Sequence, residues 1–415
     1  MKKKVLSVLL ASAMAAASLT GCATTGGDSA STAADTPTAE TTAADEASGE
    51  ASTEAAASTE APTGDTIKIG VSAPITGSLA LYGESGKNSV EMAVEEINAA
   101  GGVLGKQLEV VEFGDDQGDS TQAVNIYNKL VSEDVVAIIG TYTSSCSIPM
   151  GERAQEEGML LISPCATNAK LTLIGPNIFR ACFIDPVQGP MAAKFAKEEL
   201  GASKAAIIYA KDDDYSNGLH ESITQAWADY GLDMVYEGEC TTKDVDYSAQ
   251  ASQVVASGAD VLFYPCFLDT VPILVQQVRE AGFTGAIVGC DAWDCSDTTG
   301  KEEYFNNTYY TNHYAPQDPS EAVQNFVASY TEKYGTDSLT SAGACYYDAT
   351  KMVAQAIEAS GTGATADIIK AMTGMSYEGV TGSFTLDENG DPSKPITFVE
   401  FKDGEPVWKA NVEPE

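Results

Sequence analysis

The sequence has only two histidines, His220 and His313, among its 415 residues. Histidine is a common ligand of metals and the usual base of a nucleophilic triad, so this scarcity argues against both kinds of site. The chain also has no Gly-x-Ser-x-Gly, no His-Glu-x-x-His and no Gly-x-Gly-x-x-Gly motif. We therefore expect a protein that is not an enzyme and that uses no metal and no cofactor.

Basic residues are few: 23 lysines and arginines stand against 60 aspartates and glutamates, a formal net charge of −37. Such a charge argues against nucleic acid and against an anionic membrane surface as direct partners. It does not require a cationic ligand, because a solvated acidic exterior keeps a protein soluble without lining its pocket.

Long apolar runs are missing beyond the N-terminus, where Val5 to Leu19 follow three lysines. This arrangement is typical of a signal peptide, predicted over residues 1–21. The small residues before Cys22 resemble a bacterial lipobox, which implies cleavage and lipidation at Cys22. The alternative is an ordinary secretory signal with a chance cysteine. Residues 22–66 form an acidic linker without aromatic or basic residues, which we expect to be disordered.

Eight further cysteines follow, and none of them forms a Cys-x-x-Cys pair. Several stand inside apolar runs, so most are expected to be small buried hydrophobic residues. In an exported chain a disulfide is an open alternative, with Cys290 and Cys295 the closest pair in the sequence.

From Ile67 onward, short β-branched runs alternate with longer helical patterns, which predicts an α/β fold with doubly wound parallel sheets. Two consecutive sets of similar size indicate two lobes. The predicted strands are 67–71, 108–113, 135–139, 160–162, 205–209, 234–238, 261–264 and 286–288. The predicted helices are 86–99, 120–132, 147–157, 191–200, 217–230, 248–256, 270–281, 319–334 and 342–360. The tail 383–408 has hairpin character around residues 387–390.

Parallel sheets bind ligands beyond the carboxyl ends of their strands, so the residues after each strand deserve most weight. Strand 135–139 ends in a hydroxyl-rich turn, residues 140–147, directly before a helix. Such a turn suits an anion such as a carboxylate, although one serine acting as a helix cap would explain it equally.

Three segments carry a more specific resemblance: 67–83, 95–106 (Glu-Glu-Ile-Asn-Ala-Ala-Gly-Gly-Val-Leu-Gly-Lys) and 162–168 (Ile-Ser-Pro-Cys-Ala-Thr-Asn). They resemble the periplasmic binding proteins for leucine, isoleucine and valine, and the similarity runs from about Ile67 to Asp403. The resemblance implies a type I periplasmic binding fold, whose two lobes are joined by a three-strand hinge with the ligand cleft between them. The N-terminal lobe would comprise 67–185 plus 315–392, and the C-terminal lobe 186–314 plus 393–415.

The same resemblance implies the roles of individual residues in binding a zwitterion. Ser144 would bind the α-carboxylate, Ala166 and Thr167 would bind both ends of the amino acid, and Asp291 would pair with the α-ammonium. For Asp291 a role in the turn is the competing interpretation. Cys165 departs from the glycine common at its position.

Aromatic walls complete the predicted site. Tyr82, Tyr215 and Phe267 align with family positions where rings enclose the ligand, and Trp293 is a further candidate beside Asp291. Each of these rings could instead belong to the core. Such walls suit an uncharged side chain but do not select among uncharged side chains.

We therefore expect a monomeric, lipid-anchored, extracytoplasmic protein that captures an amino acid by lobe closure and delivers it to the permease of an ABC transporter. The branched-chain amino acids are the first candidates. The alternatives are a ligand-sensing receptor subunit on the same fold and a binding protein for a small amide or an aromatic acid. A hydrolase acting on a small amide is the weakest alternative.

Overall fold

The computed structural model describes residues 65–414. The predicted signal peptide, the lipidation at Cys22 and nearly all of the predicted linker lie outside the described residues. Within the described part, no helix is both long and apolar enough to cross a bilayer.

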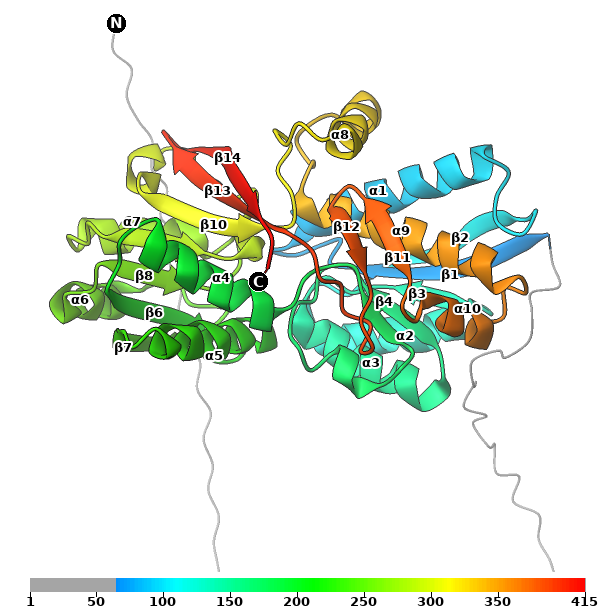
Figure 1. Ribbon diagram of the computed structural model, residues 1–415, viewed down its shortest axis with the longest axis horizontal. Coiled ribbons are helices and arrows are strands. Elements are labelled where there is room, and N and C mark those ends of the chain that lie inside the picture. Colours follow the sequence, from blue (N-terminus) through cyan, green and yellow to red (C-terminus); the bar gives the residue numbers. More distant parts are fainter. Residues whose placement is uncertain (1–64, 415) are drawn as a thin grey trace, which may run out of the picture. The chain divides into compact units, whose positions relative to one another are not determined.

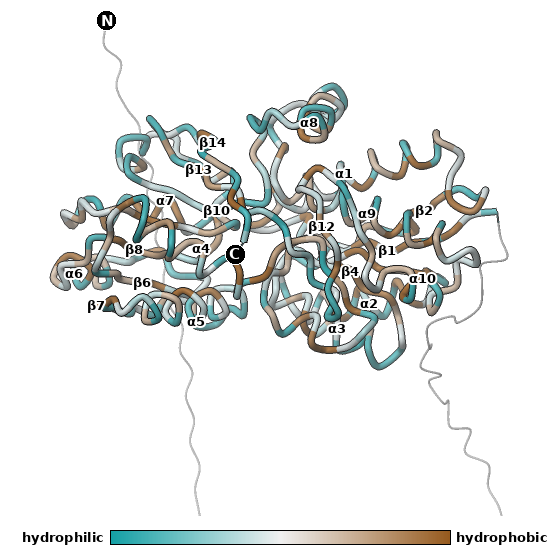
Figure 2. The backbone as a smooth tube through the Cα atoms, viewed as in Figure 1, coloured by the Kyte–Doolittle hydropathy of each residue, from teal (hydrophilic) through white to brown (hydrophobic). Residues whose placement is uncertain are grey.

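One parallel sheet organises the first lobe, with the strand order β2-β1-β3-β4-β5. Its strands are β1 (Thr66–Ala73), β2 (Gln107–Asp115), β3 (Ala137–Ile139), β4 (Leu160–Ser163) and β5 (Ile178–Arg180). β3, β4 and β5 are buried along their whole length, as expected for strands covered on both faces. The apolar residues follow the strands in the tube of Figure 2.

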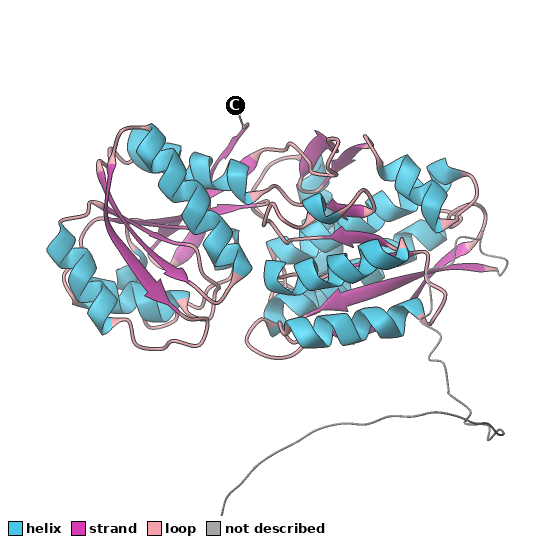
Figure 3. Cartoon of the chain, turned by 90° about the horizontal axis from the view of Figure 1, so that it is seen from below, coloured by secondary structure: helices cyan, strands magenta, loops and turns pink. Residues whose placement is uncertain are grey.

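Helices cover both faces of this sheet, as the view in Figure 3 shows. α1 (Ala80–Ala99), α9 (Ser341–Ser360) and α10 (Thr365–Met372) pack on one face in a core that includes Ile69, Val90 and Met352. α2 (Ser120–Val131) and α3 (Ser144–Glu157) pack on the other face around Leu130 and Met150. α8 (Glu321–Tyr334) and the small hairpin β11 (Ser376–Gly379) and β12 (Gly382–Thr385) complete the lobe.

The second lobe is built on a seven-stranded sheet with the order β14-β13-β10-β9-β8-β6-β7. Five strands are parallel: β6 (Lys204–Ala210), β7 (Asp233–Cys240), β8 (Val261–Tyr264), β9 (Ala286–Gly289) and β10 (Thr308–Asn312). The antiparallel strands β13 (Ile396–Lys402) and β14 (Glu405–Val412) extend the sheet beside β10 (Figure 1).

Four helices cover the second sheet. α4 (Asp185–Glu198) and α5 (Asp214–Asp229) pack on one face around Ile207 and Phe263, while α6 (Ser248–Ser257) and α7 (Val271–Glu280) pack on the other around Leu262. Short 3-10 turns lie at Thr172–Ile174, Asp291–Trp293 and Glu302–Phe305.

The chain passes between the two sheets three times, in the segments 181–184, 313–320 and 386–395. We call these the first, second and third crossovers. Two doubly wound lobes with parallel sheets confirm the predicted fold class. The predicted lobe boundaries remain a prediction.

Several element boundaries differ from the sequence expectations. α1 begins six residues before the predicted start, because its first turns bury Tyr82 and Ser85 although they lack the regular apolar spacing. α3 begins at Ser144 rather than residue 147. β5, β10, α10 and the hairpin β11–β12 are not among the predicted elements. The hairpin predicted in the tail around residues 387–390 is wrong in its position, because the Asp387–Gly390 segment is a turn between β12 and β13 and the hairpin is formed by β13 and β14.

Arg180, at the end of β5, is fully buried and joins three parts of the first lobe. Its guanidinium forms an ion pair of 2.6 Å with Asp391 of the third crossover. It also donates to the carbonyl oxygens of Ala166 (2.6 Å) and Asn168 (3.0 Å), in the loop that follows β4. Five donors in a rigid fork suit arginine to this task, and a lysine could not replace it.

We expect Arg180→Met to lower the free energy of unfolding by about 3–5 kcal/mol, because it leaves a buried carboxylate and two buried carbonyl groups without their partner. Urea unfolding followed by circular dichroism measures this change. Arg153→Met is the matched control, since Arg153 pairs with Glu156 and Glu157 near the surface and should cost less than about 1 kcal/mol. Equal losses in both variants would contradict the role given to Arg180.

Candidate functional site

A small cavity of about 10 Å³ lies where the strand ends of the two lobes meet. The first lobe contributes residues that follow β3 and β4, and the second lobe contributes residues from α5 and from the loops after β8 and β9. The lining residues are Tyr142, Thr143, Ser144, Cys165, Tyr215, Phe267, Asp291 and Ala292. Four of the eight predicted ligand residues therefore line one cavity: Ser144, Tyr215, Phe267 and Asp291.

The first-lobe wall is the N-terminus of α3. Thr143 caps this helix by accepting a hydrogen bond from the Cys146 amide, and Ser144 is the first helical residue. Ser144 is buried, and its Oγ accepts from the backbone N–H of Asn168 at 3.2 Å. A helix N-terminus with a hydroxyl beside it favours a negatively charged group. The turn thus also contains a helix cap, as the alternative interpretation predicted, and the capping residue is Thr143 rather than a serine.

The loop after β4 lies behind this wall. The Ala166 carbonyl accepts from Arg180, and its N–H donates to Ser163 Oγ at 3.0 Å, so both backbone groups of Ala166 have partners within the lobe. Thr167 is fully buried, and its Oγ1 has no hydrogen-bond partner among the described residues. Cys165, rather than Ala166 or Thr167, reaches the cavity wall.

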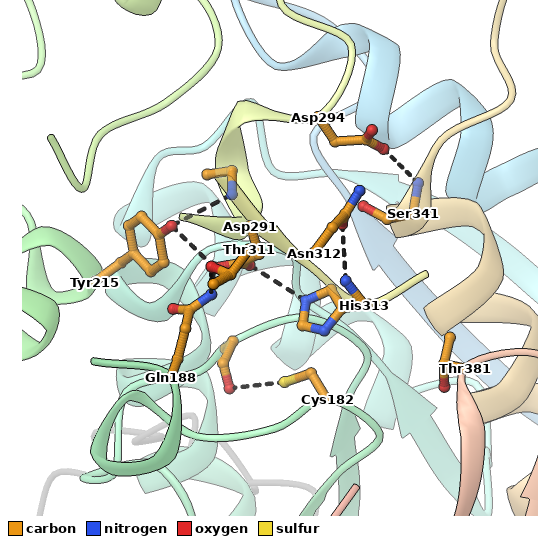
Figure 4. Close-up of polar contacts among 12 residues, drawn as sticks. Cys182, Gln188, Tyr215, Asp291, Asp294, Thr311, Asn312, His313, Ser341 and Thr381 are labelled. Carbon is orange, nitrogen blue, oxygen red and sulfur yellow. Dashed lines mark hydrogen bonds and ion pairs between the residues drawn. The ribbon is translucent and has the colours of Figure 1, made fainter. Parts of the chain in front are cut away.

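Asp291 supplies the acidic group of the second-lobe wall. It is 4% exposed, and it directly follows the loop residue Cys290 after β9. Its Oδ1 accepts from Gln188 Nε2 (2.7 Å) and Tyr215 Oη (2.9 Å), and its Oδ2 lies 3.2 Å from His313 Nε2 (Figure 4). Tyr215 in turn accepts from the Ala292 N–H. The carboxylate is thus held from three sides and is not turned to solvent.

Aromatic rings pack around the cavity in a chain of contacts. Tyr142 stacks on Tyr82 with ring centroids 4.5 Å apart, and Phe267 lies 6.4 Å from Tyr142 and 5.1 Å from Tyr215. Tyr82 does not line the cavity. Its hydroxyl lies within hydrogen-bonding distance of the carbonyl oxygens of Ala292 (2.9 Å) and Asp294 (2.7 Å) and so ties the first lobe to the second.

Trp293 lies in the core of the second lobe rather than at the cavity. Its Nε1 donates to the Tyr264 carbonyl at 2.9 Å, and its ring packs directly on Gly289. A Cβ at position 289 would lie 2.1 Å from that ring, so the glycine makes room for the indole. The core interpretation of this ring, open from the sequence, is the one that the structure favours.

A second, larger cavity of about 210 Å³ shares Thr143 and Phe267 with the first and is also lined by both lobes. Ser145 bridges the lobes here, donating to Asp213 Oδ2 at 2.9 Å and accepting from the Asp214 N–H. Burial raises the pKa of Asp213 to about 6.

Sequence reasoning missed Gln188, His313 and Tyr142 as site residues. His313 follows β10, so the rule that ligands meet strand ends would have found it had the run from Thr308 to Asn312 been recognised as a strand. Gln188 lies in the first turns of α4, and nothing in its local sequence marks it. Tyr142 stands in the hydroxyl-rich turn that was singled out.

The eight described cysteines are all free thiols, and seven of them are buried. Cys290 lies in the apolar core with α4 and α5, and the Cys295 thiol contacts the Leu339 carbonyl, so the two are not paired. Among the residues that the structure describes, no group of histidine, cysteine, aspartate or glutamate side chains is arranged to hold a metal ion.

Comparison with known proteins identifies similar chains. A family model described as periplasmic binding protein matches residues 66–406. The chain is 31% identical over 333 residues to the leucine-, isoleucine-, valine-, threonine- and alanine-binding protein of Pseudomonas aeruginosa, covering 79% of this chain and 87% of that one.

Solved structures with a similar fold include two amino-acid-binding proteins. A leucine-binding protein from Thermotoga maritima superposes with a TM-score of 0.79 at 29% identity, covering 84% of this chain and 99% of that one. A branched-chain amino acid transporter substrate-binding protein from Streptococcus pneumoniae, in complex with isoleucine, gives 0.78 at 28% identity, covering 84% and 100%.

Asp185, the first residue of α4, is a buried acid beside the site. Neither carboxyl oxygen has a hydrogen-bond partner among the described residues, and the backbone N–H donates to the Thr167 carbonyl. Burial, assisted by repulsion from Asp291, raises the pKa of Asp185 to about 8. A carboxyl whose pKa is raised on folding binds its proton more tightly in the folded state, so it costs stability increasingly as the pH rises from about 4 to about 8.

We therefore expect Asp185→Asn to unfold at a higher temperature than the wild type at pH 8, with the difference shrinking toward pH 4. The amide keeps the shape of the side chain but carries no charge at any of these pH values. Thermal unfolding of both proteins across this range measures the difference, and a difference independent of pH would contradict the assignment. Asp229→Asn, on the exposed end of α5, is the matched control.

Proposed function

We propose that this chain, which belongs to the periplasmic binding protein family, captures an uncharged amino acid between its lobes and delivers it to the permease of an ABC transporter. Branched-chain amino acids are the first candidates, because relatives and solved structures of similar fold are described as binding them. The family consists of binding proteins, which confirms the expectation that the chain is not an enzyme.

The observation that carries the proposal is one cavity with an acid on one side and a helix N-terminus on the other. Asp291 from the second lobe suits an α-ammonium, and Ser144 with the first turn of α3 suits an α-carboxylate. An amino acid bound here would touch both lobes and would stabilise the arrangement in which they meet. Ala166 and Thr167 are proposed to support the cavity from the loop after β4, behind Cys165, rather than to line its wall.

The remaining walls support an uncharged ligand side chain. Apart from Asp291, the cavity is lined by aromatic rings, two hydroxyls, a thiol and an alanine, and no cationic side chain lines it. A charged ligand side chain would therefore be desolvated without a partner, which costs several kcal/mol. Tyr142 and Phe267 are proposed as the rings that meet the ligand side chain, with Tyr82 supporting Tyr142 from behind.

Location and anchoring are proposed from the N-terminal sequence alone. The basic, apolar and small residues before Cys22 support export, cleavage and lipidation at this cysteine, with the acidic linker giving the lobes reach from the membrane. The mature protein would thus work outside the cytoplasm, held beside its permease.

A thermal-shift screen against the twenty amino acids tests the proposal. A bound ligand raises the unfolding temperature by mass action, so leucine, isoleucine or valine should raise it while aspartate and lysine should not. Stabilisation by benzoate instead of any amino acid would favour the aromatic-acid alternative, and failure of all these compounds would contradict capture of a free amino acid.

Asp291→Asn should weaken amino-acid binding at least about 30-fold, because it removes the charge that a buried ammonium requires. Isothermal titration of L-leucine measures the loss. Asp297→Asn is the matched control, since Asp297 lies six positions later and is exposed. Unchanged affinity in Asp291→Asn would show that this carboxylate does not meet the ligand.

A further inference from the structure

Asp291 is held by side chains from three separate elements. Gln188 comes from α4, Tyr215 from α5, and His313 from the residue directly after β10. All four residues are buried, Gln188 completely. An ionised carboxylate only accepts hydrogen bonds, so the His313 Nε2 carries the proton in this contact.

Gln188 and His313 are themselves fixed in place. The Gln188 amide donates to Thr311 Oγ1 at 3.0 Å as well as to Asp291. The His313 ring packs on Phe183 with centroids 4.1 Å apart (Figure 4 shows the histidine beside Asp291). His313 opens the second crossover and Phe183 belongs to the first, so the ring that contacts Asp291 is held by the segments that join the lobes.

The three donors leave the carboxylate with a defined free position. A carboxylate offers about four lone-pair sites, two on each oxygen. Gln188 and Tyr215 occupy Oδ1, whereas Oδ2 has only His313. The free accepting site on this buried group is therefore on Oδ2, and an aspartate without these contacts could rotate about its last torsion and present either oxygen.

We propose that Gln188 and His313 are positioning residues that hold Asp291 with Oδ2 toward the ligand ammonium, so that amino-acid affinity depends on two side chains outside the cavity wall. Neither residue lines the small cavity, so each acts through Asp291. The inference rests on the proposed amino-acid function and adds to it the residues that orient its acidic group.

The experiment compares two substitutions of His313 by titration with L-leucine. His313→Phe keeps a ring against Phe183 but removes the N–H, and should weaken binding about 10- to 100-fold, the usual loss for a hydrogen bond to a charged group. His313→Gln restores an N–H donor and should retain most of the affinity. If His313 served only in packing, His313→Phe would bind leucine more tightly than His313→Gln, because phenylalanine preserves the ring and glutamine does not.

The other histidine of the chain provides the matched control. His220 Nε2 lies 2.7 Å from Glu237, and its ring stacks on Tyr209 with centroids 3.8 Å apart, the same pair of contacts at a different place in the second lobe. His220→Phe should bind leucine as the wild type does. Should His313→Phe fail to fold, as judged by its unfolding temperature, Gln188→Met carries the same test, with the same expected loss.

The outcomes separate the two proposals. Wild-type affinity in His313→Phe, or equal losses in the Phe and Gln variants, would overturn the positioning role while leaving the proposed function in place. A wild-type protein that binds no leucine or other amino acid would overturn both. Loss in His313→Phe with recovery in His313→Gln supports both.

Discussion

The site depends on keeping one negative charge inside the protein. A buried carboxylate is costly unless donors surround it, and Asp291 has donors from Gln188, Tyr215 and His313. Those donors come from α4, α5 and the end of β10, so the arrangement of the second lobe is what makes the charge tolerable. The first lobe contributes groups that favour a negatively charged partner, the Ser144 hydroxyl and the N-terminus of α3.

Much of this could be predicted from the sequence because parallel α/β folds have strong local rules. The β-branched runs predicted the central strands, and the strand-end rule led to the hydroxyl-rich turn at residues 140–147. The family resemblance then singled out Ser144 and Asp291, which line one cavity. The family resemblance added the pairing of these two residues across the lobes, which no local pattern contains. The domain family is confirmed, while the individual ligand roles remain proposals.

What could not be predicted is decided by contacts between distant segments. Gln188 lies 103 positions from Asp291, and its amide would serve equally well on a solvated helix face. β5 has only three residues, too few to show a period. Trp293 lies two positions from Asp291 in the sequence, yet its side chain is buried in the core between the second sheet and the helices α6 and α7. The early start of α1 was missed for a similar reason, since Tyr82 is buried by packing against Tyr142 and Cys345 from distant parts of the chain rather than by helical spacing.

The C-terminal hairpin has a consequence for how the protein is made. β13 and β14 follow the other described strands in the sequence, yet β13 pairs with β10, and β14 pairs with β13 in turn. Until they are synthesised, β10 presents an open row of backbone donors and acceptors, the kind of edge that recruits foreign strands. The second lobe can finish folding only after β13 and β14 have been synthesised, so the open edge of β10 needs protection until then.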